Sequence, residues 1–215
     1  MEVEMIRVAL RTAICGVAIL LGGCLVSQYE HFDVRKGIDV YLADGTYTCS
    51  KEKGNDLEGA PGHLYSLVMH AQAFRGRLTI QKIETSGSVR YLVAQLSDPT
   101  VATVYAFHPV AHNVFAYTAA VTPAFKSAGP GFVVGLVSIT DRTIVPLGLA
   151  HVEKVRQLAE AHGVESSKER LEVGVFGLTL NGSKEDERRF IDALAASDLL
   201  KPDSVCSKVE VPATK

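Results

Sequence analysis

The side chains best suited to metal chemistry are His108 and His112, which flank Pro109 in a predicted turn between two strands. Two imidazoles in one turn could ligate zinc or copper. A four-residue separation brings side chains to one face only in a helix, and no helix signal occurs here, so a polar turn without metal is the competing interpretation. A true site requires a carboxylate, such as Asp98 or Asp141, to meet the pair across the sheet.

The rest of the sequence contains no established catalytic pattern. There is no Gly-x-Ser-x-Gly elbow, no phosphate-cradling glycine loop and no His-Glu-x-x-His motif. We therefore favour a protein that is not an enzyme and expect no cofactor. A hydrolase or metal-dependent enzyme with its site near His108 and His112 is the alternative.

The N-terminal residues contain the parts of an export signal in the required order. Arg7 and Arg11 supply positive charge, residues 12–21 supply an apolar stretch, and Gly22 and Gly23 are the small residues that a signal peptidase needs. Crossing a bilayer as a helix takes roughly 20 apolar residues, and the run that ends at Val26 is shorter. Cleavage is therefore favoured over an uncleaved anchor.

The tetrapeptide Leu21-Gly22-Gly23-Cys24 resembles the lipobox of bacterial lipoproteins. The resemblance implies that residues 1–23 are a signal peptide, that the Cys24 thiol takes a diacylglycerol, and that Cys24 becomes the mature N-terminus with fatty acyl chains such as palmitate. Those chains would anchor the protein in a membrane. Leu25 stands where an aspartate usually retains a lipoprotein in the inner membrane, so the resemblance implies the outer membrane, facing the periplasm. An ordinary secretory signal is the alternative, and it also exports the protein.

If Cys15 lies in the cleaved segment and Cys24 carries lipid, two cysteines remain, Cys49 and Cys206. An even remainder in an oxidising compartment favours a disulfide. It would close a loop of about 157 residues and tie the end of the chain to its first strand. Two separate thiols are the alternative, because a sequence does not fix the distance between their Cα atoms.

The composition predicts one folded domain behind the anchor. The chain has 215 residues, 47% of them hydrophobic, which is ample for one core. We assign residues 24–37 to a lipid-anchored tether, 38–206 to a single globular domain and 207–215 to a C-terminal tail. The net charge is −2 and no long run of lysine or arginine occurs, so nucleic acid is not an expected partner.

Short strand-like runs with turn residues between them predict an antiparallel meander. Asp44-Gly45, within residues 40–50, indicates a hairpin or the start of one long strand. The following runs are residues 64–71, 77–84, 90–96, 101–107, 114–121, 132–139 and 143–147. The runs at 101–107 and 132–139 are apolar on both faces and need cover on both sides, whereas 77–84 alternates and needs it on one.

Two helices and a strand are predicted to supply the cover. Apolar residues at helical spacing from Val152 end at Gly163, and Ser183 caps a second helix whose apolar stripe includes Phe190. Residues 171–180 between them are a predicted strand. The expected fold is α+β and mainly antiparallel β, a twisted or barrel-like meander sheet with a C-terminal helix-strand-helix unit packed on one face.

Aromatic residues give the best hint of a function. Five of them gather in the two-sided half of the predicted sheet, namely Tyr105, Phe107, Phe115, Tyr117 and Phe132. They are candidates for a pocket that takes an apolar ligand, and cross-strand aromatic packing in a core is the competing interpretation. We therefore expect a non-enzymatic binding or structural component of the cell envelope, with the membrane and an envelope protein or apolar ligand as partners.

Overall fold

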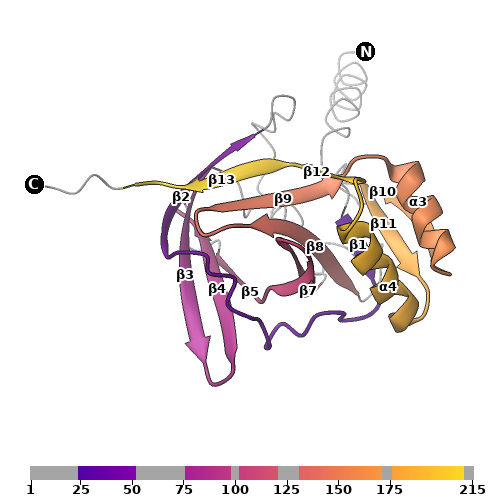
Figure 1. Ribbon diagram of the computed structural model, residues 1–215, viewed down its shortest axis with the longest axis horizontal. Helices are drawn as coiled ribbons and strands as arrows, with labels where there is room; N and C mark the ends of the chain where they lie inside the picture. Colours follow the sequence, from indigo (N-terminus) through magenta and orange to yellow (C-terminus); the bar gives the residue numbers. More distant parts are fainter. Residues whose placement is uncertain (1–23, 52–75, 98–101, 121–130, 171–175, 211–215) are drawn as a thin grey trace, which may run out of the picture.

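The computed structural model describes residues 24–51, 76–97, 102–120, 131–170 and 176–210, and the predicted strand at 64–71 lies outside them. These ranges form one branched sheet with two helices on it (Figure 1). The strands are β1 (Cys24–Ser27), β2 (Gly45–Lys51), β3 (Gly76–Thr85), β4 (Ser88–Gln95), β5 (Ala102–Tyr105), β6 (His108–Ala111), β7 (Val114–Ala120), β8 (Phe132–Ile139), β9 (Thr143–Leu149), β10 (Glu165–Arg170), β11 (Phe176–Asn181), β12 (Leu200–Pro202) and β13 (Ser204–Lys208). The helices are α3 (Val152–Ala161) and α4 (Lys184–Ala195).

The sheet is antiparallel in every pairing except that of β1 with β11. The main path is β10-β11-β1-β8-β9-β13-β2-β3-β4-β5, and β7 and β6 extend from β8. The predicted mainly antiparallel α+β class is confirmed. The strand order is not that of a meander, because the last strand, β13, lies between β9 and β2. The path ends at β10 and β5, so the sheet curves without closing.

Two clusters of buried side chains lie on opposite faces of this sheet. The first lies on the concave face and includes Tyr47, Leu78, Tyr91, Val137 and Ile139. The second lies beneath α3 and α4 and includes Leu25, Phe32, Val134, Leu136, Val155, Phe190 and Leu194. β8 therefore contributes to both clusters, as its two apolar faces predicted.

β5 does not have two covered faces, in contrast to the prediction for residues 101–107. Tyr105 and Phe107 are buried, but Val104 is 43% exposed. Ala102 and Val104, which share the other face of β5, are both exposed, so no layer covers that face of the strand. A strand with apolar residues on both faces is therefore not always buried on both faces.

The predicted helices and their end signals are confirmed. Ser183 precedes α4 and its side chain accepts a hydrogen bond from the Asp186 N–H. Gly163 follows α3 with φ +75°, a conformation that glycine adopts without steric cost. Where one strand was predicted at 171–180, the described residues between the helices form two, β10 and β11, and residues 171–175 lie outside the described ranges. β10 was missed because its sequence is entirely polar, which suits a strand at the edge of a sheet.

The predicted tether over 24–37 differs from the structure. Leu25 and Val26, in β1, are each 2% exposed, and Phe32 is also 2% exposed. After β1, residues 28–43, here called the crossing segment, run along the lower side of the molecule from α4 towards β3 (Figure 1). Val40 and Leu42 are buried on the concave face, and the strand that was predicted from residue 40 starts only at Gly45.

A disulfide joins Cys49 and Cys206, the pair that the sequence suggested. The two residues are directly opposite each other on β2 and β13. The C-terminal tail begins later than predicted, because Ser207 and Lys208 belong to β13 and the Val209 N–H donates to the Thr46 carbonyl.

Gly135 on β8 provides a test of the packing on the concave face. A Cβ at this position would lie 2.1 Å from Cζ of Tyr117, its cross-strand partner. The Tyr117 ring has little room to move, since Tyr105 and Phe107 pack against it with ring centroids 4.9 and 6.2 Å away. We expect Gly135→Ala to lower the free energy of unfolding by about 1–3 kcal/mol, measured by urea denaturation.

The matched control for this substitution removes the ring that causes the overlap. In a Tyr117→Ala background, Gly135→Ala should cost clearly less than in the wild type, because the new methyl group no longer meets the ring. Equal costs in the two backgrounds would show that the ring does not limit this position.

Candidate functional site

The five aromatic candidates do not form a common pocket in the structure. Tyr105, Phe107 and Tyr117 are buried and pack against one another, with Tyr105 and Phe107 stacked at 5.9 Å between centroids. Phe115 is partly buried against the same cluster, and Phe132, at the start of β8, is also partly buried. The three buried rings fill the concave face of the sheet. They are therefore part of the hydrophobic core, which was the alternative to a ligand pocket.

Among the described residues, His108 and His112 do not share a site with a carboxylate. His108 Nε2 lies 3.1 Å from the Asp33 carbonyl oxygen, and the ring packs against Phe32. Burial of His108 lowers the pKa of its imidazole, so the neutral form is favoured. His112 is exposed and lies beside Asn113.

Of the two carboxylates named for a metal site, the structure describes only Asp141, and it does not complete one. Asp141 is exposed and pairs with Arg142, and Asp98 lies outside the described residues. Within the described ranges, no three histidine, cysteine, aspartate or glutamate residues are grouped closely enough to hold a metal ion. The predicted turn at Pro109 is instead strand β6, where proline occupies a bulged edge position.

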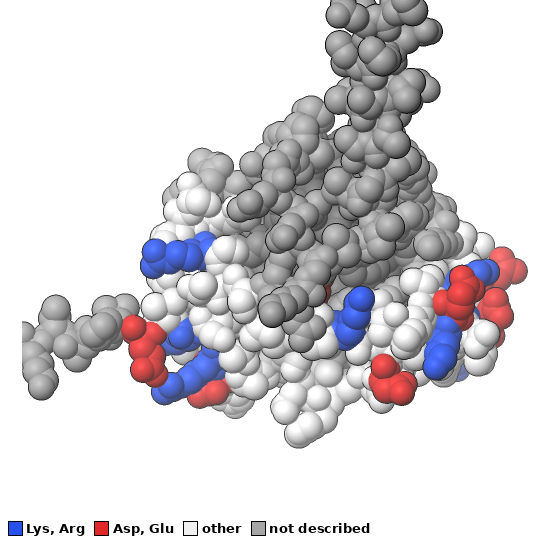
Figure 2. Space-filling view, turned by 90° about the horizontal axis from the view of Figure 1, so that it is seen from above, with Lys and Arg blue, Asp and Glu red and all other residues white. Residues whose placement is uncertain are grey.

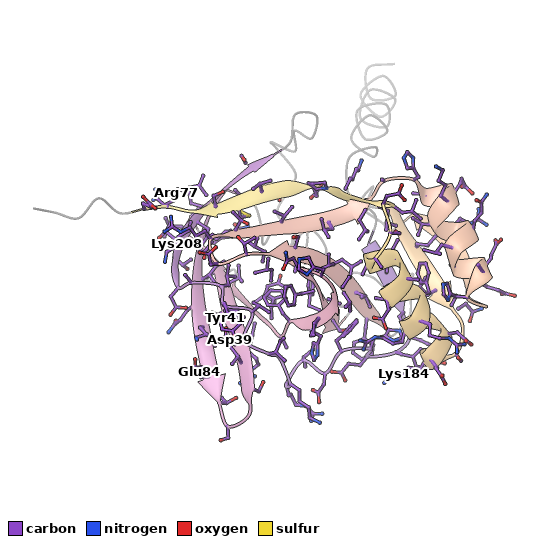
Figure 3. The ribbon with its side chains drawn as sticks, in the orientation of Figure 1. Asp39, Tyr41, Arg77, Glu84, Lys184 and Lys208 are labelled. Atoms are coloured by element: carbon purple, nitrogen blue, oxygen red, sulfur yellow. A yellow bond between two sulfur atoms is a disulfide. The ribbon has the colours of Figure 1, made fainter. Side chains whose placement is uncertain are left out.

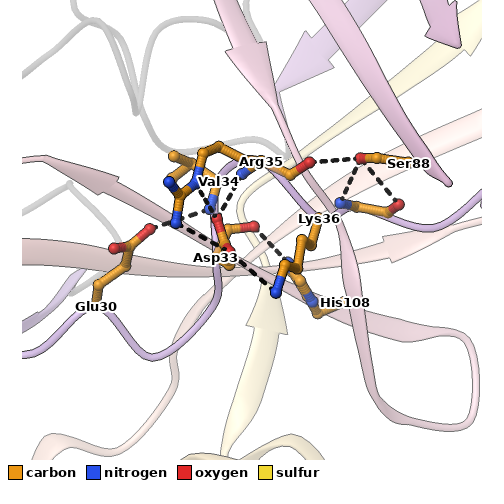
Figure 4. A network of polar contacts seen from close by, with 8 residues as sticks. Glu30, Asp33, Val34, Arg35, Lys36, Ser88 and His108 are labelled. Atoms are coloured by element: carbon orange, nitrogen blue, oxygen red, sulfur yellow. Dashed lines mark hydrogen bonds and ion pairs between the residues drawn. The ribbon is translucent and has the colours of Figure 1, made fainter. Parts of the chain in front are cut away.

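The crossing segment is fixed by an exposed polar network (Figure 4). The Asp33 carboxylate accepts from the Arg35 backbone N–H at 2.9 Å and from its guanidinium at 3.0 Å. These contacts lower the pKa of Asp33. The Ser88 hydroxyl, on β4, donates to the Arg35 carbonyl at 2.6 Å and accepts from the Gly37 N–H. A side chain at Gly37 would collide with the Val89 carbonyl oxygen, so glycine lets the segment lie directly on β4.

The group most suggestive of chemistry is a buried cluster of Ser27, His31 and Glu187, which sequence reasoning missed. His31 Nε2 lies 2.9 Å from Glu187 Oε2, and the Ser27 hydroxyl donates to the same oxygen at 2.5 Å. Ser27 Oγ is also 3.0 Å from His31 Nε2. The other oxygen of Glu187 accepts from the Gly182 N–H at 3.1 Å. Ser27, His31 and Glu187 are 1%, 8% and 0% exposed.

The cluster has the residue types of a hydrolase triad but not its geometry. In a triad the serine and the carboxylate bind opposite ring nitrogens of the histidine. Here both approach Nε2 of His31, and Nδ1 has no hydrogen-bond partner among the described residues. The side chains of His31 and Glu187 are also fully buried, which keeps substrate away. The hydrogen bonds of the cluster join β1, the crossing segment and α4. Its role is therefore structural, since it holds these three elements together.

The sequence contained little sign of this cluster. Glu187 follows Glu185 and Asp186, and such a run of charged residues is typical of a solvated helix face. Glu185 fits that interpretation, with 83% of its side chain exposed, but Glu187 is turned inward. The burial depends on a β1 that sequence analysis did not predict.

A second polar group holds the far end of the crossing segment (Figure 3). Asp39 accepts from the Tyr91 hydroxyl at 2.7 Å and from the Tyr41 N–H at 2.8 Å, and Lys82 Nζ lies 3.2 Å from its other oxygen. The Tyr91 hydrogen bond is the main cause that lowers the pKa of Asp39. Tyr41 is 79% exposed and has φ +58°, an uncommon conformation for a bulky residue.

This group predicts a pH-dependent contribution to stability. Because the pKa of Asp39 is lower in the folded protein than its ordinary 3.8, its contribution is fully present above that value and is lost as the pH falls further. We expect the stability difference between the wild type and Asp39→Asn to be largest near pH 6 and to shrink below about pH 4.

Urea denaturation at a series of pH values measures that difference. Tyr91→Phe is the matched control, because it removes the hydroxyl that contributes most to the shift, and it should flatten the pH dependence of the difference. A difference between the wild type and Asp39→Asn that stays constant from pH 2.5 to pH 6 would contradict the assignment.

The charge on the described part of one face is mixed. Figure 2 shows Lys and Arg beside Asp and Glu in small groups over the visible described surface. Neither described helix is long and apolar enough to cross a bilayer.

In comparisons with known proteins, no family model, no curated protein and no solved structure matches this chain.

Proposed function

We propose that this chain is a lipid-anchored cell-envelope protein, acylated at Cys24, that serves as a non-enzymatic binding or structural component. The observation that carries the proposal is the order of cationic residues, apolar stretch and Leu21-Gly22-Gly23-Cys24. Because Leu25 follows the acylated cysteine, the proposed location is the outer membrane, on its periplasmic side.

The disulfide supports export. A bond between Cys49 and Cys206 forms and persists in an oxidising compartment such as the periplasm, and such bonds are rare in the cytosol. Cys206 is fully buried, so the bond belongs to the core of the fold and not to an exposed redox centre. The disulfide therefore supports the compartment outside the cytoplasm that the signal proposes.

The buried groups support a binding or structural role over catalysis. The Ser27, His31 and Glu187 cluster is sealed and lacks triad geometry, and His108 is held by a backbone carbonyl. The buried aromatic rings contact one another in the core. An interaction with another envelope molecule would therefore use the outer surface of the domain.

The proposal is tested by membrane fractionation of the protein expressed from its native start. The wild type should be found with the membranes, and Cys24→Ser should leave that fraction or accumulate as an unprocessed precursor. Cys15→Ser is the matched control, since it changes a cysteine in the segment that is cleaved away, and it should behave like the wild type. A wild type that stays soluble would overturn the proposal.

A further inference from the structure

β1 begins at Cys24, the residue that the proposed function acylates. It is an interior strand, because it pairs with β11 on one side and with β8 on the other. Leu25 lies opposite Leu178 on β11 and Val134 on β8. In the mature protein of that proposal, this interior strand therefore begins at the lipid acceptor itself.

The residues that follow Cys24 are among the most buried of the described chain. Leu25 and Val26 are each 2% exposed and Ser27 is 1% exposed. The Ser27 hydroxyl donates to Glu187, and Leu25 packs in the cluster beneath α4. Releasing β1 as a flexible linker would break two strand pairings and expose these side chains together.

This arrangement determines how far the domain can stand from a membrane. Consecutive Cα atoms lie about 3.8 Å apart, so Leu25 cannot lie farther than that from the acylated cysteine. A free segment of about fourteen residues, the length of the expected tether, would instead reach about 45–50 Å. The structure uses those residues in β1 and the crossing segment.

We infer that the domain, once acylated at Cys24, lies directly on the membrane surface without a flexible tether. The inference rests on the proposed function, and it adds that the lipid surface beside β1 is itself a contact of the domain. A partner is then reached at or in the same membrane, since the domain cannot extend across the periplasmic space. The orientation of the domain on the bilayer is also restricted, because the anchor leaves from an interior strand.

The test uses the purified acylated protein in vesicles of phosphatidylethanolamine and phosphatidylglycerol, with hydrogen exchange of β1 as the first measurement. We expect the amides of Val26 and Ser27 to be as strongly protected as those of β8. A control variant carries one extra leucine and about ten glycine and serine residues between Cys24 and Leu25. Its β1 should remain protected while its inserted residues exchange at once.

The second measurement is neutron reflectometry of both proteins on a supported bilayer of the same lipids. The wild type should show a protein layer in contact with the headgroups, and the variant should show a hydrated gap. Fast exchange in β1 of the wild type, or a wild-type gap equal to that of the variant, would overturn the inference while leaving acylation intact. A mass that shows no acyl group on Cys24 would overturn the proposed function and the inference with it.

Discussion

Removing the disulfide with Cys49→Ala and Cys206→Ala together is expected to lower the free energy of unfolding by about 5 kcal/mol on the chain-entropy model. The bond joins residues 157 positions apart, so its loss frees a long loop in the unfolded state. The native state is affected as well, because the bond fastens β13 to β2, and β13 is the strand that connects β2 to β9.

Urea denaturation of the double variant and of the wild type measures this effect. The matched control is Thr48→Ala with Ser207→Ala, the neighbouring opposed pair on the same two strands, where both residues are exposed. That control should change stability by no more than about 0.5 kcal/mol per site. A cysteine double variant as stable as this control would contradict the role given to the bond.

Glu187→Ala is expected to lower the free energy of unfolding by about 3–5 kcal/mol, because each buried polar group left without its hydrogen-bond partner costs about 1–3 kcal/mol. The substitution deprives three groups of their acceptor: the Ser27 hydroxyl, the His31 ring and the Gly182 N–H. Ser27 and His31 cannot turn to solvent without movement of β1 or the crossing segment, because both are buried.

The control for this prediction lies half a turn away on the same helix. Glu185 is exposed, and Glu185→Ala should cost no more than about 0.5 kcal/mol. A cycle with His31→Ala should also show that the two losses are not additive, since His31 and Glu187 contact each other directly. Equal costs for Glu187→Ala and Glu185→Ala would show that the buried cluster does not stabilise the fold.

The elements that could be predicted from the sequence are those whose local residue pattern matches their burial and their ends in the fold. β8 is apolar on both faces and is buried on both faces, and Ser183 caps α4 as its position suggested. The disulfide partners could be proposed by elimination, although only the structure shows that β2 and β13 are neighbours. That pairing depends on residues far apart in the chain, which local patterns do not report.

The elements that were missed have misleading local signals. β10 is polar because it lies at a sheet edge, and β6 contains Pro109 at a bulged edge position. Residues 28–37 look like a polar linker, yet Phe32 is buried beneath α4 and His31 is joined to Glu187. Sequence periodicity does not reveal such contacts, because they need a segment without regular structure to meet a helix about 156 residues away.

The same limits applied to the candidate site. Tyr105, Phe107 and Tyr117 were correctly placed together, but aromatic type alone does not distinguish a core from a pocket, and the structure shows a core. His108 and His112 are close in sequence, yet they end up with different partners because β6 separates them. Ser27 and Glu187 lie 160 positions apart, and only the fold brings them together.

The most direct test of the account is the intact mass of the mature protein isolated from the membranes of a cell that expresses it from its native start. We expect a polypeptide that begins at Cys24, carries the added mass of a diacylglycerol, with or without a further acyl chain, and retains the bond between Cys49 and Cys206. A polypeptide that keeps residues 1–23, or one that begins near Cys24 without any acyl mass, would contradict it.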